Sequence, residues 1–109
     1  MSYFVNKEQD LTLQEVYPGI KGRLVHTKLT TVADFSIAAG TVLPTHHHPH
    51  EQTSTILAGR FLFMVGEEER LLEAGDVAVI PRNVPHSGKA LTDCRIIDVF
   101  SPVREDYRV

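Results

Sequence analysis

Hydrophobic and polar positions alternate with a period of two along several short segments of the chain. In residues 31–38, Phe35 and Ile37 share one face, and Asp34 and Ser36 share the other. This alternation is typical of a β-strand with one buried face. Four further segments rich in apolar or β-branched residues are predicted to be strands: 52–58, 60–65, 77–80 and 95–100.

Turn-forming residues separate these segments, and no long helix is indicated. Residues 11–16 are the best helical candidate, and they are long enough for one or two turns at most. Many short strands separated by glycine and proline favour a sandwich or a barrel. We therefore expect an all-β fold, with no helix of three or more turns between Gly22 and Ser101. A chain of 109 residues is typical of a single domain.

The segment at residues 60–65 is apolar on both faces, with Phe61 and Phe63 on one side and Leu62 and Met64 on the other. The outer face of such a strand also needs cover. In a small barrel a second subunit is the natural cover, so we expect a homodimer.

The composition limits the partners and the compartment. The chain is 42% hydrophobic and 23% charged, with a net charge of −3. A protein with a negative net charge binds nucleic acid or an anionic membrane poorly. No apolar run approaches the ~20 residues that a membrane-spanning helix needs. The single Cys94 can form neither an intrachain disulfide nor a cysteine zinc site. With no secretory signal visible, we expect a cytoplasmic protein.

The candidate chemistry begins with a histidine cluster, since four of the six histidines lie within residues 46–50. In an extended segment His46 and His48 project to the same side, so they can converge on one metal ion while His47 faces away. Gln52 offers a neutral oxygen donor, and His86 is the obvious further ligand. The alternative is an exposed loop or an adventitious metal-binding tract.

The spacing of this cluster resembles the first of two signature motifs of the cupin superfamily. That motif is a glycine, five residues, His-x-His, three or four residues, an acidic ligand, six residues and a glycine. Here five residues separate Gly40 from His46, His48 completes His-x-His, and six residues separate Gln52 from Gly59. The departure is Gln52, which stands where the family has an acidic ligand.

The second cupin motif is also matched. Five residues separate Gly75 from Pro81, and His86 follows at the family spacing. Asn83 replaces the second glycine, and Ala90 stands where the family has asparagine. We expect the first exchange to be tolerated, because among non-glycine residues asparagine readily adopts a positive φ.

The resemblance implies a double-stranded β-helix, the cupin jelly-roll barrel, formed by residues 1–109 around a motif core at 40–86. Residues 1–21 would then pack on the barrel or exchange between subunits. The resemblance also implies one divalent metal ion, which could be nickel, zinc, iron, manganese or copper. The implied ligands are His46, His48, Gln52 and His86.

A narrower resemblance is to the small cupins of the pectin-degradation type called KdgF. It rests on His46 to Gln52 and on residues 98–107. That family opens 4,5-unsaturated uronate monomers, released from pectin or alginate, to the linear 5-keto sugar acid. The implied partner is thus a small, carboxylate-bearing, sugar-like substrate. The family's other implicated positions fall on Asp98, Phe100 and Arg104.

The residues themselves allow these roles. Asp98 and Phe100 are two apart in a predicted strand, so an inward face would put a carboxylate in an apolar lumen near the metal, where it can act as a general acid or base. An outward Asp98 on the surface is the alternative. Arg104 follows Pro102, beyond the strand, and can either clamp a carboxylate or pair with its acidic neighbours at the surface.

Gln52 sets the charge of the site, because a neutral amide and three neutral imidazoles leave the full +2 on the ion. Such an ion is a strong Lewis acid, suited to polarising a hydroxyl, carbonyl or carboxylate. His50 and Glu51 remain candidates for the ligand set. We expect His50 at its rim, and Glu51 pointing away from Gln52 in an extended register.

Three functions fit these features. The first is a metal-dependent isomerase of unsaturated uronates, with Asp98 moving protons and Arg104 holding the carboxylate. The second is a cupin dioxygenase or another oxygen-using metalloenzyme. The third is a non-enzymatic protein that binds a small ligand. Dependence on dioxygen separates the first two.

Overall fold

The computed structural model describes residues 2–108, which form ten β-strands, one short α-helix and one 3-10 turn. The elements are α1 (Lys7–Asp10), β1 (Gln14–Tyr17), β2 (Ile20–His26), β3 (Thr31–Ile37), β4 (Val42–His46), β5 (Glu51–Ala58), β6 (Phe61–Val65), β7 (Glu68–Leu72), β8 (Val77–Ile80), β9 (His86–Ala90), β10 (Cys94–Ser101) and η1 (Glu105–Tyr107).

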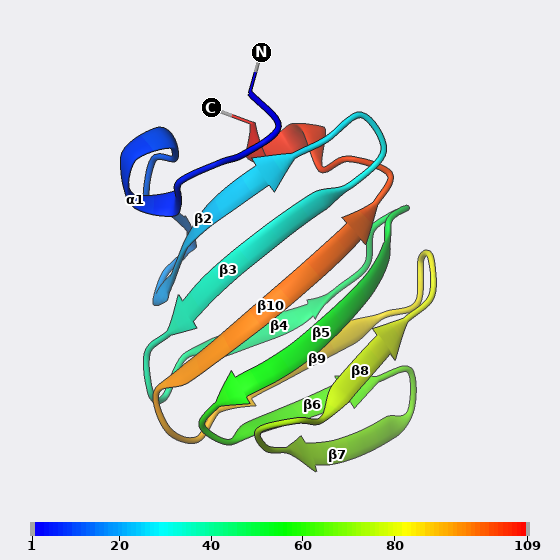
Figure 1. Cartoon of the computed structure of the whole chain (residues 1–109). Coiled ribbons are helices and arrows are strands. Elements are labelled where there is room, and N and C mark those ends of the chain that lie inside the picture. The colour runs from blue at the N-terminus through cyan, green and yellow to red at the C-terminus, as the bar shows by residue number, and fades with distance from the viewer. Residues whose placement is uncertain (1, 109) are drawn as a thin grey trace.

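The strands form two antiparallel sheets that pack face to face (Figure 1). The six-stranded sheet has the order β1-β2-β3-β10-β5-β8, and the four-stranded sheet has the order β4-β9-β6-β7. This is the predicted all-β jelly-roll barrel. Between Gly22 and Ser101 the structure contains no helix, as expected. No helix within residues 2–108 has the length and apolar character needed to cross a membrane.

The start of the chain differs from the sequence-based expectation. Residues 11–16, the best helical candidate, form no helix, because the helical turn is Lys7–Asp10 and Gln14–Tyr17 is a strand. Asn6 caps the helix, since its side-chain oxygen accepts hydrogen bonds from the two backbone N–H groups that follow Lys7. After the helix, β1 pairs with β2, so the backbone N–H and C=O groups of residues 14–17 form hydrogen bonds between strands and not within a helix.

The core lies between the sheets and follows the period-two pattern. Along β3, Ala33, Phe35 and Ile37 are buried, and along β10 so are Ile96 and Phe100. β10 lies between β3 and β5, so it holds the centre of the larger sheet. The apolar core therefore positions the inward side chains of β5 and β10, which reach the site described below.

The outer surface shows where apolar residues lack cover. The outward residues Leu62 and Met64 of β6 are half-buried and neighbour Lys89 and Glu69 in the adjoining strands. Apolar exposure is larger on the edge strand β8, where residues 77 and 79 are valines that are 52% and 63% exposed. The homodimer stays a prediction.

Gly59, which closes the first cupin-like motif, occupies a crowded position at a φ of +90°. A Cβ atom there would lie 2.2 Å from the backbone oxygen of Asp93 and 2.9 Å from Cα of Cys94. Gly40, which opens the motif, has a similar φ of +84° but open space around it. Backbone conformation and crowding therefore both require glycine at position 59. At position 40 only the backbone conformation favours glycine.

We predict that Gly40→Ala lowers the free energy of unfolding by about 1–2 kcal/mol, the cost of a left-handed backbone. Gly59→Ala adds a steric clash and lowers it by about 2–5 kcal/mol. Urea denaturation of the two variants measures the difference. Equal losses of stability would show that the close approach to Asp93 is not a real constraint.

An ion cluster ties α1 to the outer face of the six-stranded sheet. The carboxylate of Asp34 accepts two hydrogen bonds from Arg95, at 3.1 and 2.7 Å, and pairs with Lys7. These donors, Arg95 first, lower the pKa of Asp34 from its ordinary 3.8 to about 2, although partial burial opposes the change. Ionised Asp34 thus stabilises the fold above its unfolded pKa.

We predict a pH-dependent difference in stability between the protein and Asp34→Asn. Because the folded pKa is the lower one, the advantage of Asp34 is constant above about pH 5 and disappears as the pH falls from about 4 to 2. Melting temperatures of both proteins across this range measure the difference. A difference that persists unchanged at pH 2 would contradict the role of the cluster.

Candidate metal centre

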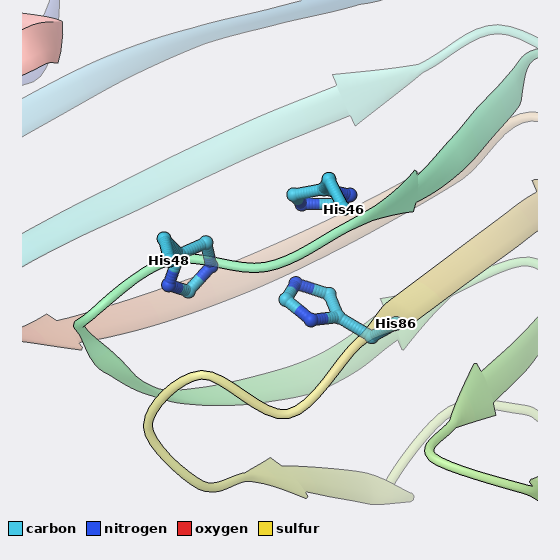
Figure 2. Close-up of side chains that lie close together, drawn as sticks. All are labelled: His46, His48 and His86. Carbon is cyan, nitrogen blue, oxygen red and sulfur yellow. The ribbon is translucent and has the colours of Figure 1, made fainter.

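Four predicted ligands come from three strands and a loop, and they meet at one end of the barrel. His46 is the last residue of β4 and His86 is the first residue of β9, and these two residues are paired in the sheet register. His48 lies on the loop after β4, and Gln52 is the second residue of β5. Figure 2 shows the three imidazole rings pointing toward a common space.

The loop that carries His48 is fastened to the turn between β8 and β9. The backbone N–H of Asn83 donates to the carbonyl of His48 at 2.9 Å, and Nε of Arg82 donates to the carbonyl of Pro49 at 2.9 Å. Asn83 has a φ of 62°, which confirms the expectation for the residue that replaces the motif glycine. The second motif therefore supplies His86 and also positions His48.

The three histidines form a compact donor cluster. Candidate ligand atoms of His46, His48 and His86 all lie within 4.8 Å of one another. The ring centroids of His46 and His86 are 4.2 Å apart, and those of His48 and His86 are 4.9 Å apart. A single metal ion fits between such atoms, because imidazole nitrogens bind metal ions at about 2.0–2.1 Å.

Backbone carbonyl groups fix the orientation of all three rings. In each ring Nδ1 lies near a carbonyl oxygen two residues away in the chain: Pro44 at 2.9 Å from His46, His50 at 3.1 Å from His48, and Val84 at 2.9 Å from His86. A carbonyl only accepts hydrogen bonds, so we assign the imidazole proton to Nδ1. Each Nε2 is then left with a lone pair, as metal-binding histidines require.

Two observations at these Nε2 atoms fit a bound cation. Nε2 of His86 is buried and has no hydrogen-bond partner among the described residues. Nε2 of His48 lies 3.0 Å from Oε1 of Gln52, whose amide nitrogen donates to Oγ of Ser54 at 3.0 Å. With the proton of His48 on Nδ1, two acceptor atoms face each other, and a cation would satisfy both.

Burial keeps the histidines in the form that binds metal. Removal from water lowers the pKa of His86 to about 4, despite the opposing hydrogen bond to Val84, and it also lowers the pKa of His48. Both rings are therefore neutral at neutral pH. A neutral imidazole needs no deprotonation before it binds an ion.

The neighbours of these residues lie as expected in the sequence analysis. His47 is exposed, and Glu51 is exposed while Gln52 beside it is buried. His50 is half-buried, with its ring centroid 5.3 Å from that of His48 and 6.5 Å from that of Phe100. His50 therefore lies at the rim of the cluster.

Asp98 and Phe100 face inward and line a cavity between the sheets, together with His46, His86 and Gln52. Oδ1 of Asp98 is buried without a hydrogen-bond partner among the described residues. Burial raises the pKa of Asp98 to about 6, although Ser54, Gln52 and Arg104 oppose this change. A bound cation would lower it.

Arg104 also lines the cavity, and its side chain is only 8% exposed. Its Nε and Nη2 donate to the carboxylate of Asp106 at 3.0 and 2.8 Å. The guanidinium carbon lies 4.0 Å from the ring centroid of Tyr107 and 4.7 Å from that of Phe100. Arg104 therefore pairs with an acidic neighbour, as one sequence-based alternative expected, but the pair forms at the cavity and not on the surface. Its binding of a carboxylate stays a prediction.

Two residues of this site were not found from the sequence. Ser54 is buried beneath Gln52, and a period of two from Gln52 could have indicated it. Tyr107 follows the last strand and carries no local pattern that places it in a cavity. Its position depends on the path of the chain after β10, which the alternation of residues does not encode.

Comparison with known proteins identifies the family. The family model described as Cupin domain matches residues 33–100, which include all four predicted ligands. The chain belongs to the cupin family.

This cupin is 30% identical over 110 aligned residues to the pectin degradation protein KdgF of Dickeya dadantii, with 96% of each chain covered. It is 34% identical to the solved KdgF from a Halomonas species, with a TM-score of 0.87 and 99% of each chain covered. An RmlC-like cupin from Shewanella frigidimarina is 28% identical, with a TM-score of 0.91 and 99% of this chain and 97% of that chain covered. These relatives match the whole barrel, not only the motifs.

We predict that His86→Ala weakens zinc binding by about 100-fold or more, because it removes one of three converging nitrogens. His47→Ala, on the same loop as His48 but exposed, is the matched control and keeps the affinity of the unmodified protein. Isothermal titration of metal-free protein measures both. Comparable losses in the two variants would mean that the histidine run binds metal non-specifically.

Proposed function

We propose that this cupin is a metal-dependent isomerase that opens 4,5-unsaturated uronate monomers to the linear 5-keto sugar acid. The observation that carries the proposal is one cavity lined by two histidines of the three-histidine cluster, a buried carboxyl group and a buried arginine. Such a uronate presents matching groups, namely hydroxyl oxygens, a proton to be moved and a carboxylate. The similarity to two proteins named KdgF supports the same reading.

His46, His48, Gln52 and His86 would hold the metal ion. When bound, a divalent cation supplies a strong Lewis acid that polarises substrate oxygens, and these uncharged ligands would leave its full +2 charge available. The donor set of three imidazoles and an amide is compatible with nickel, zinc, iron, manganese or copper.

Arg104 would bind the carboxylate of the substrate. Arginine suits this role because its planar guanidinium donates two parallel hydrogen bonds to a carboxylate. The side chain is buried at the cavity, where exclusion of water strengthens such a contact. Binding at this end would orient the sugar ring toward the histidines.

Asp98 would move the proton. Ring opening breaks the bond between C1 and the ring oxygen while the C1 hydroxyl loses its proton and becomes an aldehyde. The electron pair stays on the former ring oxygen, giving an enolate at C5, and C4 then takes up a proton to form the 5-keto group. One proton leaves an oxygen and one arrives at a carbon, so a single carboxyl group can carry both steps without water or a redox partner.

Phe100 would form the apolar wall of the site. Phe100 is 2% exposed and its ring lies against His48, with ring centroids 5.9 Å apart. A wall of this kind keeps water from the reacting atoms and limits the positions of the sugar ring. Asp98, two residues earlier on β10, lies on the same face and is thus next to this dry surface.

We predict that the metal-loaded protein accelerates the loss of ultraviolet absorbance of an unsaturated uronate monomer above the uncatalysed rate, under nitrogen. Asp98→Asn lowers this rate by about 10²–10⁴-fold, because it removes the proton carrier, and leaves zinc affinity intact. Asp10→Asn, on the exposed helix α1, is the control and keeps full activity.

Two results would contradict the proposal. Absence of any acceleration without dioxygen, with each of the five candidate metals supplied in turn, would overturn the isomerase assignment. A full rate in Asp98→Asn would overturn the role of that carboxyl group while leaving the reaction itself in place.

A further inference from the structure

The C-terminal turn η1 holds the Arg104 side chain in one orientation. Asp106 occupies one side of the guanidinium, the edge formed by Nε and Nη2. Asp106 is the only carboxylate within residues 2–108 that pairs with Arg104. The pair is asymmetric, since the Arg104 side chain is 8% exposed and that of Asp106 is 57% exposed. The carboxylate thus approaches the guanidinium from the solvent side.

A guanidinium has two edges that can each receive a carboxylate through parallel hydrogen bonds, one formed by Nε and Nη2 and one by Nη1 and Nη2. Because Asp106 fills the first edge, a second carboxylate can bind in this manner only at the second. That second edge is the end of the side chain, and Arg104 lines the cavity.

Two aromatic rings, Tyr107 and Phe100, lie against the guanidinium of Arg104. Its carbon lies 4.0 Å from the ring centroid of Tyr107, and the rings of Tyr107 and Phe100 are nearly perpendicular, with centroids 6.0 Å apart. A cation over an aromatic face is attracted to it, so moving the guanidinium away from Tyr107 is unfavourable. Asp106 and Tyr107 together therefore leave the guanidinium little freedom to turn.

The turn itself is anchored to the rest of the barrel. Gln14 of β1 donates from Nε2 to the carbonyl of Tyr107 at 3.1 Å. The backbone N–H of Arg104 donates to Oγ1 of Thr31, which is fully buried on β3, at 2.9 Å. Both ends of the segment that carries Arg104 and Tyr107 are thus bound to strands of the six-stranded sheet.

We propose that Asp106 and Tyr107 are positioning residues that make Arg104 receive the carboxylate of the substrate end-on, at its Nη1 and Nη2 atoms. The identity of the anion as a uronate rests on the proposed function, whereas the direction of binding follows from the Asp106 pair. End-on binding fixes the distance of the sugar ring from Asp98, so it governs the reaction more than the affinity.

The first test is spectroscopic and needs no turnover. In zinc-loaded protein labelled with ¹⁵N-arginine, added D-galacturonate, which has the carboxylate but no double bond, shifts the Nη signals of Arg104 and leaves its Nε signal in place. D-galactose, which lacks the carboxylate, shifts neither. A large Nε shift would show that the ligand displaces Asp106, and no shift at all would show that Arg104 binds no carboxylate; either result overturns the proposal.

The second test separates positioning from simple stabilisation. Asp106→Ala removes the orienting carboxylate and a charge that repels the substrate, so we expect kcat to fall by about 10–100-fold while KM changes by less than about threefold. Glu105→Ala is the matched control, because Glu105 lies on the same turn and pairs with Arg108, which is not at the cavity. Asp106→Glu restores part of kcat.

The outcomes distinguish this inference from the proposed function. Equal losses of kcat in Glu105→Ala and Asp106→Ala would show that Asp106 only stabilises the turn. That result would overturn the inference even if the unmodified protein is an active isomerase. A protein without ring-opening activity would still report the edge used by D-galacturonate, so the proposed function can fail while the end-on site stands.

Discussion

The register of β10 between β3 and β5 is the constraint on which the site depends. In this register Asp98 lies opposite Ser54, and Phe100 lies opposite Gln52. The four side chains therefore meet on the inner face of the larger sheet. A slip of one residue would turn Val99 inward and remove both the carboxyl group and the aromatic wall from the cavity. The apolar residues of β3 and β10 that fill the barrel thus also keep Asp98 and Phe100 directed into the cavity.

A second constraint acts on the opposite sheet and the loop after β4. Carbonyl groups two residues from His46, His48 and His86 hold the Nδ1 side of each ring, so the Nε2 atoms converge. The cavity then has a cluster of uncharged donors at one side, the buried carboxyl of Asp98 on the adjoining sheet and the cation of Arg104 at the C-terminal turn. A small anionic sugar acid matches these three features, which is why we favour chemistry driven by a Lewis acid and a proton carrier.

The sequence predicts the features that depend on periodicity and spacing. Alternation predicts that Asp98 and Phe100 share one face of β10, and the structure shows that this face is the inward one. The positive φ of Asn83 follows from its place in the second motif. The position of α1 was missed because a single cap at Asn6 and pairing of β1 decide it, and neither has a strong pattern. The sequence also did not predict the position of Tyr107 or the edge of Arg104 that Asp106 occupies. Both depend on how the chain folds back after β10.

Anomalous X-ray diffraction tests directly whether the four predicted ligands, His46, His48, Gln52 and His86, bind one divalent ion. In crystals grown with zinc, data collected at the zinc edge should give one strong peak about 2.0–2.2 Å from Nε2 of His46, His48 and His86 and from Oε1 of Gln52. A peak bound instead by the exposed His47, or by Nδ1 atoms, would contradict this set of ligand atoms. So would the absence of a peak in protein that binds zinc in solution.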